Sequence, residues 1–419
     1  MPETSTAAAG RPPPIIVVGG GHAGVQLVAA LADAGASAGV QLVCDELWAP
    51  YQRPPLSKQF LRDERLDLNP LRPERWYLER GVELLAGDEA VQIDRQHRSL
   101  RLGSGRVLPW SRLVLATGAR ARRLPGLHDG LENVHTLRQA ADAQRLRHAL
   151  AHADELTVIG GGFIGLEVAA SARLMGRRVR VIETRARLLS RSVSPALADH
   201  ALQHHRAQGI EVHLGAVVSA WEHDEHRLQA VIVDGRRLPV DQLVLGVGAL
   251  PRTQLAQDAG LACGDGVLVD ACLRSSDPAI LAIGDCARCT PADGGSPLRL
   301  ESIQNAQDQA RVAAATLLGD PRPYRPQPSF WSEQGALRLQ MSGLLPAGGT
   351  GEPPVRSVRR PLAGGDGFSL LHYAGDQLVC VESANAPMDH MIARKLLEAG
   401  RTVAPQAAAD PQQRLHDWL

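Results

Sequence analysis

The sequence predicts an α/β protein in which one unit, a parallel sheet covered by helices, occurs twice. Residues 156–185 show the first copy most clearly, because they read as strand, glycine turn, helix and strand. Residues 15–45 repeat the same order nearer the N-terminus. Residues 105–118 also align without gaps on residues 235–248, and each of these segments follows one of the two copies. We therefore predict two copies of one α/β domain.

The copy at residues 156–185 contains the spacing G-x-G-x-x-G at Gly160, Gly162 and Gly165. The first glycine permits a tight turn, and the second lets backbone N–H groups approach a pyrophosphate at the helix N-terminus. The third lets helix and strand pack closely, and Ile164 lies in the first helical turn. Glu183, at the end of the second strand, can accept hydrogen bonds from an adenosine ribose. The alternative is a glycine-rich turn in an ordinary α/β core.

The copy at residues 15–45 has the same spacing at Gly19, Gly21 and Gly24. Its acidic residue is displaced, because Cys44 ends the strand and Asp45 follows it. Two dinucleotide sites in one chain indicate two nucleotides. A flavin with a nicotinamide is the usual pair in redox enzymes.

Composition argues against several other classes of function. The chain has 45 basic and 45 acidic residues, a net charge of +0, so its overall charge gives no sign of nucleic-acid or membrane binding. No apolar run reaches the roughly 18 residues that span a bilayer. The six scattered cysteines fit a reducing cytoplasm. Residues 1–13 are rich in alanine and proline and are expected to form a disordered tail.

The order of the motifs predicts that one copy is inserted in the other. A buried strand in residues 267–285 ends in Gly284 and Asp285, and a helix is expected to begin near Ile303. This aspartate can bind a flavin ribityl hydroxyl, and the helix N-terminus can face the flavin ring. We therefore predict an FAD-binding domain over residues 14–119 and 251–325. The NAD-binding domain, residues 120–250, is its insertion.

The pattern of predicted elements changes after a stretch rich in proline, which is typical of a linker. We predict a small α+β domain with an antiparallel sheet over residues 326–419. Its expected strands are residues 337–341, 355–359, 368–373 and 377–381. Its expected helix is residues 388–399.

Several motifs give the chain a resemblance to a known family. The most specific is YQRPPLSK at residues 51–58, and FWSEQ follows at residues 330–334. The chain contains four further motifs of this kind: ATG at 116–118, GFIGLE at 162–167, IGD at 283–285 and ESIQNA at 301–306. From about residue 14 to residue 397 the sequence resembles the flavoprotein ferredoxin reductases that serve Rieske dioxygenases and bacterial cytochromes P450. The resemblance implies the fold of glutathione reductase, with FAD and NADH as cofactors.

The resemblance also implies roles for single residues. Lys58 and Glu167 would pair beside flavin N5, where an ammonium stabilises negative charge on the reduced flavin. The alternative is a surface lysine and a helix-start glutamate. The other candidate FAD and NAD contacts are Asp45, Arg53, Ala90, Thr117, Gly118, Arg138, Gly248, Gly284, Asp285 and Ile303.

Two residues are candidates for the exit of electrons to a partner. The resemblance places Trp331 near the flavin, and a tryptophan of the core or of an interface is the alternative. Arg311 could face an acidic ferredoxin, or could be merely solvated. The implied function is that of a cytoplasmic NADH-dependent reductase of a [2Fe–2S] ferredoxin, which in turn feeds a Rieske oxygenase or a cytochrome P450.

Missing cysteines narrow the chemistry. No cysteine lies between Cys44 and Cys263, where disulfide reductases of this fold carry a redox pair, so thiol chemistry at the flavin is not expected. Cys286 and Cys289 form a C-x-x-C directly after the expected flavin contact, and no metal or redox role is expected for them. Two alternatives stay open: an NADH oxidoreductase for quinone or oxygen, and an NADH-binding redox sensor of the apoptosis-inducing-factor kind. Arg185 leaves NADPH open as the nucleotide.

Overall fold

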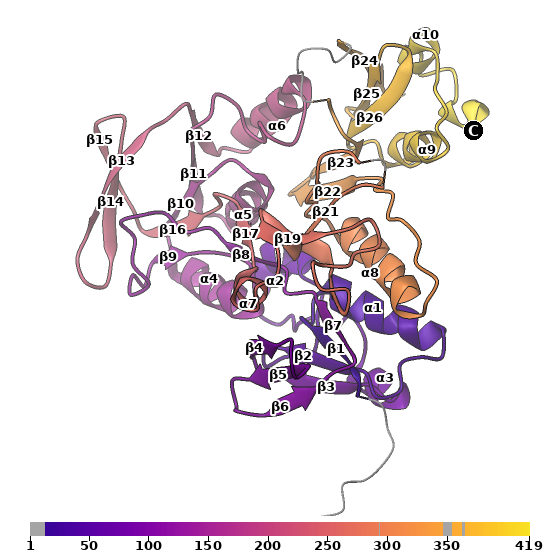
Figure 1. The fold of residues 1–419 in the computed structure, drawn as a ribbon. Coiled ribbons are helices and arrows are strands. Elements are labelled where there is room, and N and C mark those ends of the chain that lie inside the picture. The colour runs from indigo at the N-terminus through magenta and orange to yellow at the C-terminus, as the bar shows by residue number, and fades with distance from the viewer. Residues whose placement is uncertain (1–12, 293, 347–353, 363–364) are drawn as a thin grey trace, which may run out of the picture. The chain divides into compact units, whose positions relative to one another are not determined.

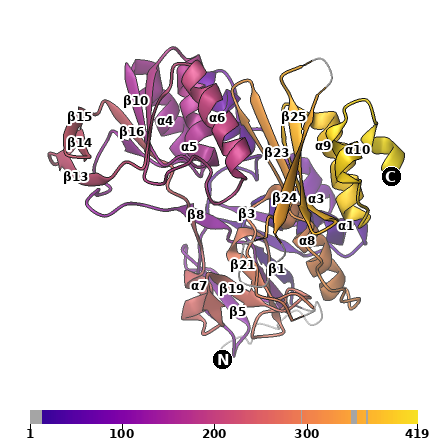
Figure 2. The ribbon, with the colours of Figure 1, turned by 90° about the horizontal axis from the view of Figure 1, so that it is seen from above.

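The computed structural model describes residues 13–292, 294–346, 354–362 and 365–419, so residues 1–12 of the predicted tail lie outside it. The chain divides into two compact units, whose helices and strands are labelled in Figure 1 and seen from above in Figure 2. The first unit runs to residue 52 and includes residues 69–119 and 251–326. The second unit comprises residues 53–68, 120–250 and 327–419.

The first unit is built on a five-stranded parallel sheet with strand order β20-β7-β1-β2-β3. These strands are β1 (Ile15–Val18), β2 (Gln41–Cys44), β3 (Glu83–Ala86), β7 (Arg112–Leu115) and β20 (Ile280–Ala282). Short apolar runs such as IIVV in β1 are typical of parallel strands, because such strands are buried on both faces. Since β20 pairs with β7, the chain after residue 251 completes the sheet that β1 begins.

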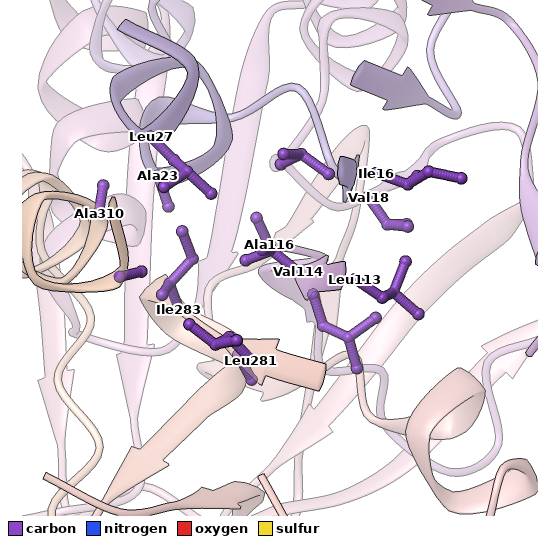
Figure 3. Close-up of a cluster of buried hydrophobic side chains, with 14 of the residues drawn as sticks. Ile16, Val18, Ala23, Leu27, Leu113, Val114, Ala116, Leu281, Ile283 and Ala310 are labelled. Carbon is purple, nitrogen blue, oxygen red and sulfur yellow. The ribbon is translucent and has the colours of Figure 1, made fainter. Parts of the chain in front are cut away.

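Helices pack on this sheet and form the core of the unit with it. They are α1 (His22–Asp33), α3 (Glu74–Glu79) and α8 (Ile303–Leu317), whereas α7 (Gln254–Asp258) contacts β4 (Ala90–Asp94). Helices α1 and α8 contact each other, and Figure 3 shows Leu27 of α1 and Ala310 of α8 near side chains of β1, β7 and β20. Fully buried residues such as Ile16 and Leu113 belong to this core. The unit also contains two small sheets.

These small sheets have three strands each. Their strands are β4 (Ala90–Asp94), β5 (Ser99–Leu102) and β6 (Val107–Pro109), and β18 (Cys263–Gly264), β19 (Gly266–Val269) and β21 (Ala287–Cys289). The single strand expected within residues 267–285 is therefore two strands, β19 and β20, separated by a turn. Gly284 and Asp285 follow β20 in a short 3₁₀ helix, η2 (Gly284–Cys286).

The second unit contains a parallel sheet of the same kind, with strand order β12-β11-β10-β16-β9. Its strands are β9 (Val134–His135), β10 (Glu155–Ile159), β11 (Arg178–Glu183), β12 (Glu211–Leu214) and β16 (Gln242–Leu245). Its helices are η1 (Pro54–Ser57), α2 (Gln59–Arg62), α4 (Ala140–His152), α5 (Phe163–Leu174) and α6 (Pro195–Ala207). An antiparallel sheet is formed by β13 (Val218–His223), β14 (Leu228–Val233) and β15 (Arg236–Pro239). Strands β8 (Ala119–Ala121) and β17 (Ala249–Pro251) lie where the chain passes between the units.

The backbone confirms the repeat seen in the sequence. In residues 105–118 a short strand, β6, precedes the buried β7, and in residues 235–248 β15 precedes the buried β16. Both segments begin and end in glycine with positive φ, which is 68° at Gly118 and 107° at Gly248. The predicted α/β fold with two Rossmann-type units is thus confirmed.

A five-stranded antiparallel sheet, of order β22-β23-β26-β25-β24, occupies the last part of the second unit. Its strands are β22 (Ser329–Gln334), β23 (Leu337–Gly343), β24 (Val355–Pro361), β25 (Phe368–Ala374) and β26 (Gln377–Ala384). The helices are α9 (Pro387–Glu398), α10 (Pro405–Ala409) and η3 (Leu415–Trp418). Helices α6 and α9 both contact β26. The sequence predicted four of the strands and α9, and it missed β22.

In the described part of the chain, no helix combines the length and the apolar character needed to cross a membrane.

Candidate functional site

The first glycine of each turn holds a conformation that other residues rarely adopt. Gly19 follows β1 with a φ of 119°, and Gly160 follows β10 with a φ of 105°. A Cβ atom would lie 2.1 Å from the carbonyl oxygen of Ala116 at Gly19, and 2.5 Å from that of Gly246 at Gly160. Only glycine fits at either position, because both the φ angle and the space exclude a side chain.

The third glycine of each turn brings helix and strand together. A Cβ atom on Gly24 would lie 2.0 Å from the carbonyl oxygen of Gly19, and one on Gly165 would lie 2.4 Å from that of Gly160. Helices α1 and α5 therefore begin close against the strand ends that precede them.

The N-termini of α1 and α5 both have glycine at the N-cap position. Their N-cap residues, Gly21 and Gly162, provide no side-chain cap, and neither helix has an acidic residue in its first turn. A Cβ atom on Gly21 would meet nothing within 4 Å, and one on Gly162 would meet only the carbonyl oxygen of Gly246, at 3.7 Å. Neither N-cap thus carries a side chain that would fill the space at the helix N-terminus, where the sequence predicts a dinucleotide pyrophosphate.

The acidic residue of the second copy lies next to its glycine turn. The Glu183 carboxylate accepts a hydrogen bond from the Gly161 N–H at 2.7 Å and another from the Arg185 N–H at 2.8 Å. Ile164 is 44% exposed at the start of α5, and a Cβ atom on Gly248 would lie 3.5 Å from the Arg191 guanidinium. The structure therefore holds the Glu183 carboxylate beside the glycine turn through two backbone N–H groups.

In the first unit, Arg252 connects three of the predicted FAD contacts. Its guanidinium pairs with Asp45 at 2.6 Å, and its backbone carbonyl accepts a hydrogen bond from the Thr117 hydroxyl at 2.7 Å. Its backbone N–H donates to the Gly118 carbonyl at 2.9 Å. Nothing in the sequence singled out Arg252, because the strand-turn-helix pattern ends well before it.

The other candidates of the first unit lie around α8 and β4. The Gly284 N–H donates to the Gln309 side chain at 2.7 Å, and Asp285 follows in η2. Ile303 is the first residue of α8, whose N-cap hydroxyl, that of Ser302, accepts from the Asn305 N–H at 3.1 Å. Two candidates are partly exposed: Ala90 begins β4, and Arg311, in α8, is 56% exposed and pairs with Asp308 at 2.7 Å.

In the second unit, the two predicted arginines meet. The Arg53 guanidinium donates to the backbone carbonyl of Arg138 at 2.9 Å. The backbone N–H of Arg138 donates to the Asp142 carboxylate, which also forms the capping box of α4 with Gln139. This fixes Arg138 at the helix N-terminus.

Lys58 and Glu167 form a buried ion pair. The Lys58 ammonium lies 2.6 Å from the Glu167 carboxylate, and the two side chains are 10% and 5% exposed. Two prolines, Pro54 and Pro55, begin η1 and stiffen the segment before Lys58, and the ammonium also donates to the Pro54 carbonyl at 3.1 Å. The alternative of a surface lysine is wrong.

Two serines complete the surroundings of Glu167. Its carboxylate accepts hydrogen bonds from the Ser57 hydroxyl at 2.5 Å and from the Ser332 hydroxyl at 2.6 Å. The Trp331 ring, 38% exposed, lies 5.3 Å from the Lys58 ammonium, within the range of a cation–π contact. Both serines stand inside motifs that the sequence singled out, YQRPPLSK and FWSEQ, but their hydroxyls received no role there.

The C-x-x-C motif has no features of a redox site. Cys286 and Cys289 are buried and are not joined to each other. Burial raises the pKa of the Cys286 thiol and raises that of Cys289 to about 12, so both thiols are held protonated at neutral pH. Among the residues with described positions, no cluster of His, Cys, Asp and Glu side chains could hold a metal ion.

Comparison with known proteins adds a family context. Residues 13–310 match the family model of pyridine nucleotide-disulphide oxidoreductases, and residues 329–419 match the reductase C-terminal model. Rhodocoxin reductase from Rhodococcus erythropolis is 39% identical over 93% of this chain and 90% of its own length. Terpredoxin reductase from a Pseudomonas species is 40% identical over 95% of this chain and 96% of its own.

Two solved structures are similar over nearly the whole chain. The ferredoxin reductase for the CYP199A2 system from Rhodopseudomonas palustris is 38% identical, with a TM-score of 0.90, and the match covers 97% of this chain and 99% of that one. The covalent complex of putidaredoxin reductase with putidaredoxin contains a chain that is 33% identical, with a TM-score of 0.88 and 97% coverage of both.

Proposed function

Because this chain belongs to the pyridine nucleotide-disulphide oxidoreductases, and its close relatives there are ferredoxin reductases, we propose that it passes electrons from NADH through FAD to a [2Fe–2S] ferredoxin. One observation carries the proposal: each copy of the repeated unit has a turn that only glycine fits, followed by a helix with a glycine N-cap and no acidic residue in its first turn. Transfer from a nicotinamide to a flavin needs two such nucleotide sites in one chain.

The residues present fit both nucleotides. Those that would hold FAD are Gly19, Gly21, Gly24, Asp45, Arg53, Ala90, Thr117, Gly118, Arg138, Gly284, Asp285 and Ile303. Those that would hold NADH are Gly160, Gly162, Ile164, Gly165, Glu183 and Gly248. When bound, FAD accepts a hydride from NADH and releases electrons singly, which is chemistry that no side chain of the chain supplies.

We assign the catalytic electrostatics to Lys58 and Glu167. Arrival of a hydride adds negative charge to its acceptor, and a fixed ammonium stabilises that charge. Glu167 holds the ammonium in place through a charge-assisted hydrogen bond of 2.6 Å. Because both side chains are buried, water screens this field less than it would at the surface.

We propose an acidic [2Fe–2S] ferredoxin as the partner, with Arg311 and Trp331 in the docking surface. Several relatives carry names of oxygenase systems, such as the p-cumate 2,3-dioxygenase reductase component from Pseudomonas putida. By analogy, the ferredoxin would feed a Rieske oxygenase or a cytochrome P450. A cytoplasmic location is supported by the free cysteines of the chain, which suit a reducing compartment.

The test is a steady-state comparison of electron acceptors with the FAD-loaded protein. NADH oxidation is measured with [2Fe–2S] ferredoxins of bacterial oxygenase systems, with a soluble quinone and with oxygen alone. We expect the highest kcat/KM with a ferredoxin. A higher kcat/KM with quinone would support a quinone reductase. A stable NADH complex that reduces none of the acceptors tested would support a redox sensor. Either outcome would contradict the proposed function.

A further inference from the structure

We propose that Ser332 is a positioning residue for the proposed catalytic pair: its hydroxyl fixes the Glu167 carboxylate, which in turn fixes the Lys58 ammonium. Ser332 lies on β22, the first strand of the C-terminal sheet, and is fully buried. The C-terminal sheet would thus contribute to the hydride-transfer step itself. This inference rests on the proposed function, because that function gives Lys58 its role.

The two oxygens of Glu167 are held from different directions. Oε2 accepts hydrogen bonds from the Lys58 ammonium at 2.6 Å and from the Ser57 hydroxyl at 2.5 Å. Oε1 accepts from the Ser332 hydroxyl at 2.6 Å. The first two donors belong to the segment at the end of η1, whereas Ser332 comes from β22, so the carboxylate cannot rotate without breaking one of these contacts.

A chain of hydrogen bonds fixes the direction in which the Ser332 hydroxyl points. Gln334, two residues further along β22, donates from Nε2 to the Ser332 oxygen at 3.2 Å. The Gln334 amide oxygen lies 2.7 Å from Nε2 of His205 on α6. Since an amide oxygen only accepts, His205 donates here. The Ser332 oxygen therefore receives a hydrogen bond from Gln334, and its own proton is directed to Glu167.

The state of His205 agrees with this direction. The side chain is buried, and burial lowers its pKa to about 4, so the ring is neutral at pH 7. A neutral ring carries one N–H, and the contact with Gln334 places it on Nε2. Every donor in the series from His205 to Glu167 points the same way.

The residue next to Ser332 contacts the other member of the pair. The Trp331 ring lies 5.3 Å from the Lys58 ammonium. Consecutive side chains of a strand point to opposite faces, and here one reaches the carboxylate while the other borders the ammonium. Strand β22 therefore touches both charges of the ion pair.

Loss of the Ser332 hydroxyl should displace the ammonium. A buried carboxylate oxygen without a donor is costly, and the carboxylate would turn to recover a partner. A displacement of about 1 Å at a catalytic group can slow a reaction about a hundredfold. We therefore expect Ser332→Ala to slow flavin reduction by NADH between about tenfold and a hundredfold, with little effect on NADH binding.

The chain offers a matched control in the same sheet. Ser369 on β25 is also fully buried, and its hydroxyl bonds that of Ser383 at 2.8 Å. Ser369→Ala removes a buried hydroxyl from the same sheet, but it leaves the hydrogen bonds of Glu167 intact. Ser332→Thr retains a hydroxyl on the same strand and serves as the rescue.

The chain contains only two lysines, Lys58 and Lys395, which gives a direct readout of the ammonium. Protein labelled with ¹⁵N at lysine Nζ should show two side-chain signals, with exposed Lys395 as the internal reference. We expect Ser332→Ala to shift the Lys58 signal, and Ser369→Ala to leave it in place. Stopped-flow reduction of the FAD-loaded proteins by NADH then gives the limiting rate and the NADH dissociation constant for each variant.

The proposal requires that the Lys58 signal and the limiting rate change together in Ser332→Ala and return toward the wild type in Ser332→Thr. It is overturned if Ser332→Ala leaves either one unchanged, or if Ser369→Ala changes both equally. If the wild type reduces no ferredoxin, the proposed function fails, but the Lys58 signal still reports whether Ser332 positions the pair. The two failures can therefore be distinguished.

Discussion

At the scale of single residues, Lys58 and Glu167 depend on each other for stability as well as for chemistry. Both side chains are buried, so removal of one leaves the other as an unpaired buried charge, which costs about 3–5 kcal/mol. Lys58→Met should therefore lower the free energy of unfolding by that amount. It should also slow flavin reduction about a hundredfold, because a preorganised charge near the reacting atoms is lost.

A double variant separates the two effects. Lys58→Met with Glu167→Gln removes both charges, while the glutamine can still bond Ser57 and Ser332. Urea denaturation should show most of the stability recovered, and stopped-flow reduction should stay slow with FAD still bound. Reduction at the wild-type rate in either variant would contradict the catalytic role of Lys58.

Glu183 should determine the preference between the two nicotinamide nucleotides. Its carboxylate would repel a 2′-phosphate, and Arg185 beside it would attract one. Glu183→Gln removes the charge but keeps an oxygen for the Gly161 N–H, which lies 2.7 Å from the carboxylate. The ratio of kcat/KM for NADPH to that for NADH should rise by about an order of magnitude, since a repulsion between two charges near the surface is worth about 1 kcal/mol or more.

The double variant Glu183→Gln with Arg185→Gln is the control for this change. Without the arginine the phosphate has lost its attraction, so the gain for NADPH should largely disappear. A wild-type enzyme that already prefers NADPH would overturn the assignment of Glu183.

The sequence was informative about residues that backbone geometry requires, and less so about those that side-chain contacts create. Gly19 and Gly160 could be predicted because a tight turn after a strand admits only glycine. Ser332 and Arg252 could not, because their roles arise from partners far away in the sequence. Ser332 bonds Glu167, and Arg252 pairs with Asp45. No local pattern records such pairs.

At the scale of elements, the same contrast explains why β22 was missed. Four strands and α9 of the C-terminal sheet follow apolar patterns and were predicted within a few residues of their bounds. In β22, by contrast, the fully buried residues are polar, Ser332 and Gln334, while the aromatic Trp331 is partly exposed. Hydrophobic alternation cannot detect a strand whose inward side chains form a hydrogen-bond network.

One buried histidine on each of two helices that contact the C-terminal sheet should make the free energy of unfolding depend on pH. His205 of α6 and His390 of α9 are buried, and burial lowers the pKa of each to about 4. In the unfolded chain both regain an ordinary pKa near 6.5. Between about pH 6.5 and pH 4 the unfolded state therefore binds protons that the folded state does not, and the free energy of unfolding falls as pH falls.

Each histidine should contribute a slope of up to about 1.4 kcal/mol per pH unit in this window, and none above it. Urea denaturation at pH 7, 6 and 5 measures the slope. His205→Gln, whose amide can still bond Gln334, should reduce it, as should His390→Gln. The same replacement at exposed His416 is the control. An equal slope in all four proteins would refute this account.

At the scale of the whole molecule, the two parallel sheets of the duplicated unit obtain one of their edge strands from different places in the sequence. In the first sheet the edge strand β20 pairs with β7 and comes after it in the sequence. In the second sheet the edge strand β9 pairs with β16 and comes before it in the sequence. The glycine motifs and the strand after each helix are shared, so the sequence revealed the duplication. The IGD motif directly after β20 predicted that this strand belongs to the first domain, whereas β9 has only two residues and carries no motif, so its place in the second sheet was not predictable.

The last prediction concerns the net charge, which is zero for the whole chain. Attraction of an acidic ferredoxin must therefore come from a local group of charges, and we assign Arg311 to it. Opposite charges raise association rates and add salt dependence. Arg311→Glu should thus lower kcat/KM for ferredoxin strongly at low salt and less at high salt. Reduction of ferricyanide, which needs no docking surface, should hardly change.

Arg145→Glu is a closely matched control for Arg311→Glu. Each arginine lies on a helix, pairs at 2.7 Å with an aspartate three residues earlier, and is more than half exposed. Each change also alters the net charge equally, so a general charge effect would slow both variants with ferredoxin. A loss confined to Arg311→Glu and to the ferredoxin assay places the docking surface at α8. If ferricyanide reduction falls as well, Arg311 instead supports the flavin site or the fold, and if neither activity falls, ferredoxin binds elsewhere.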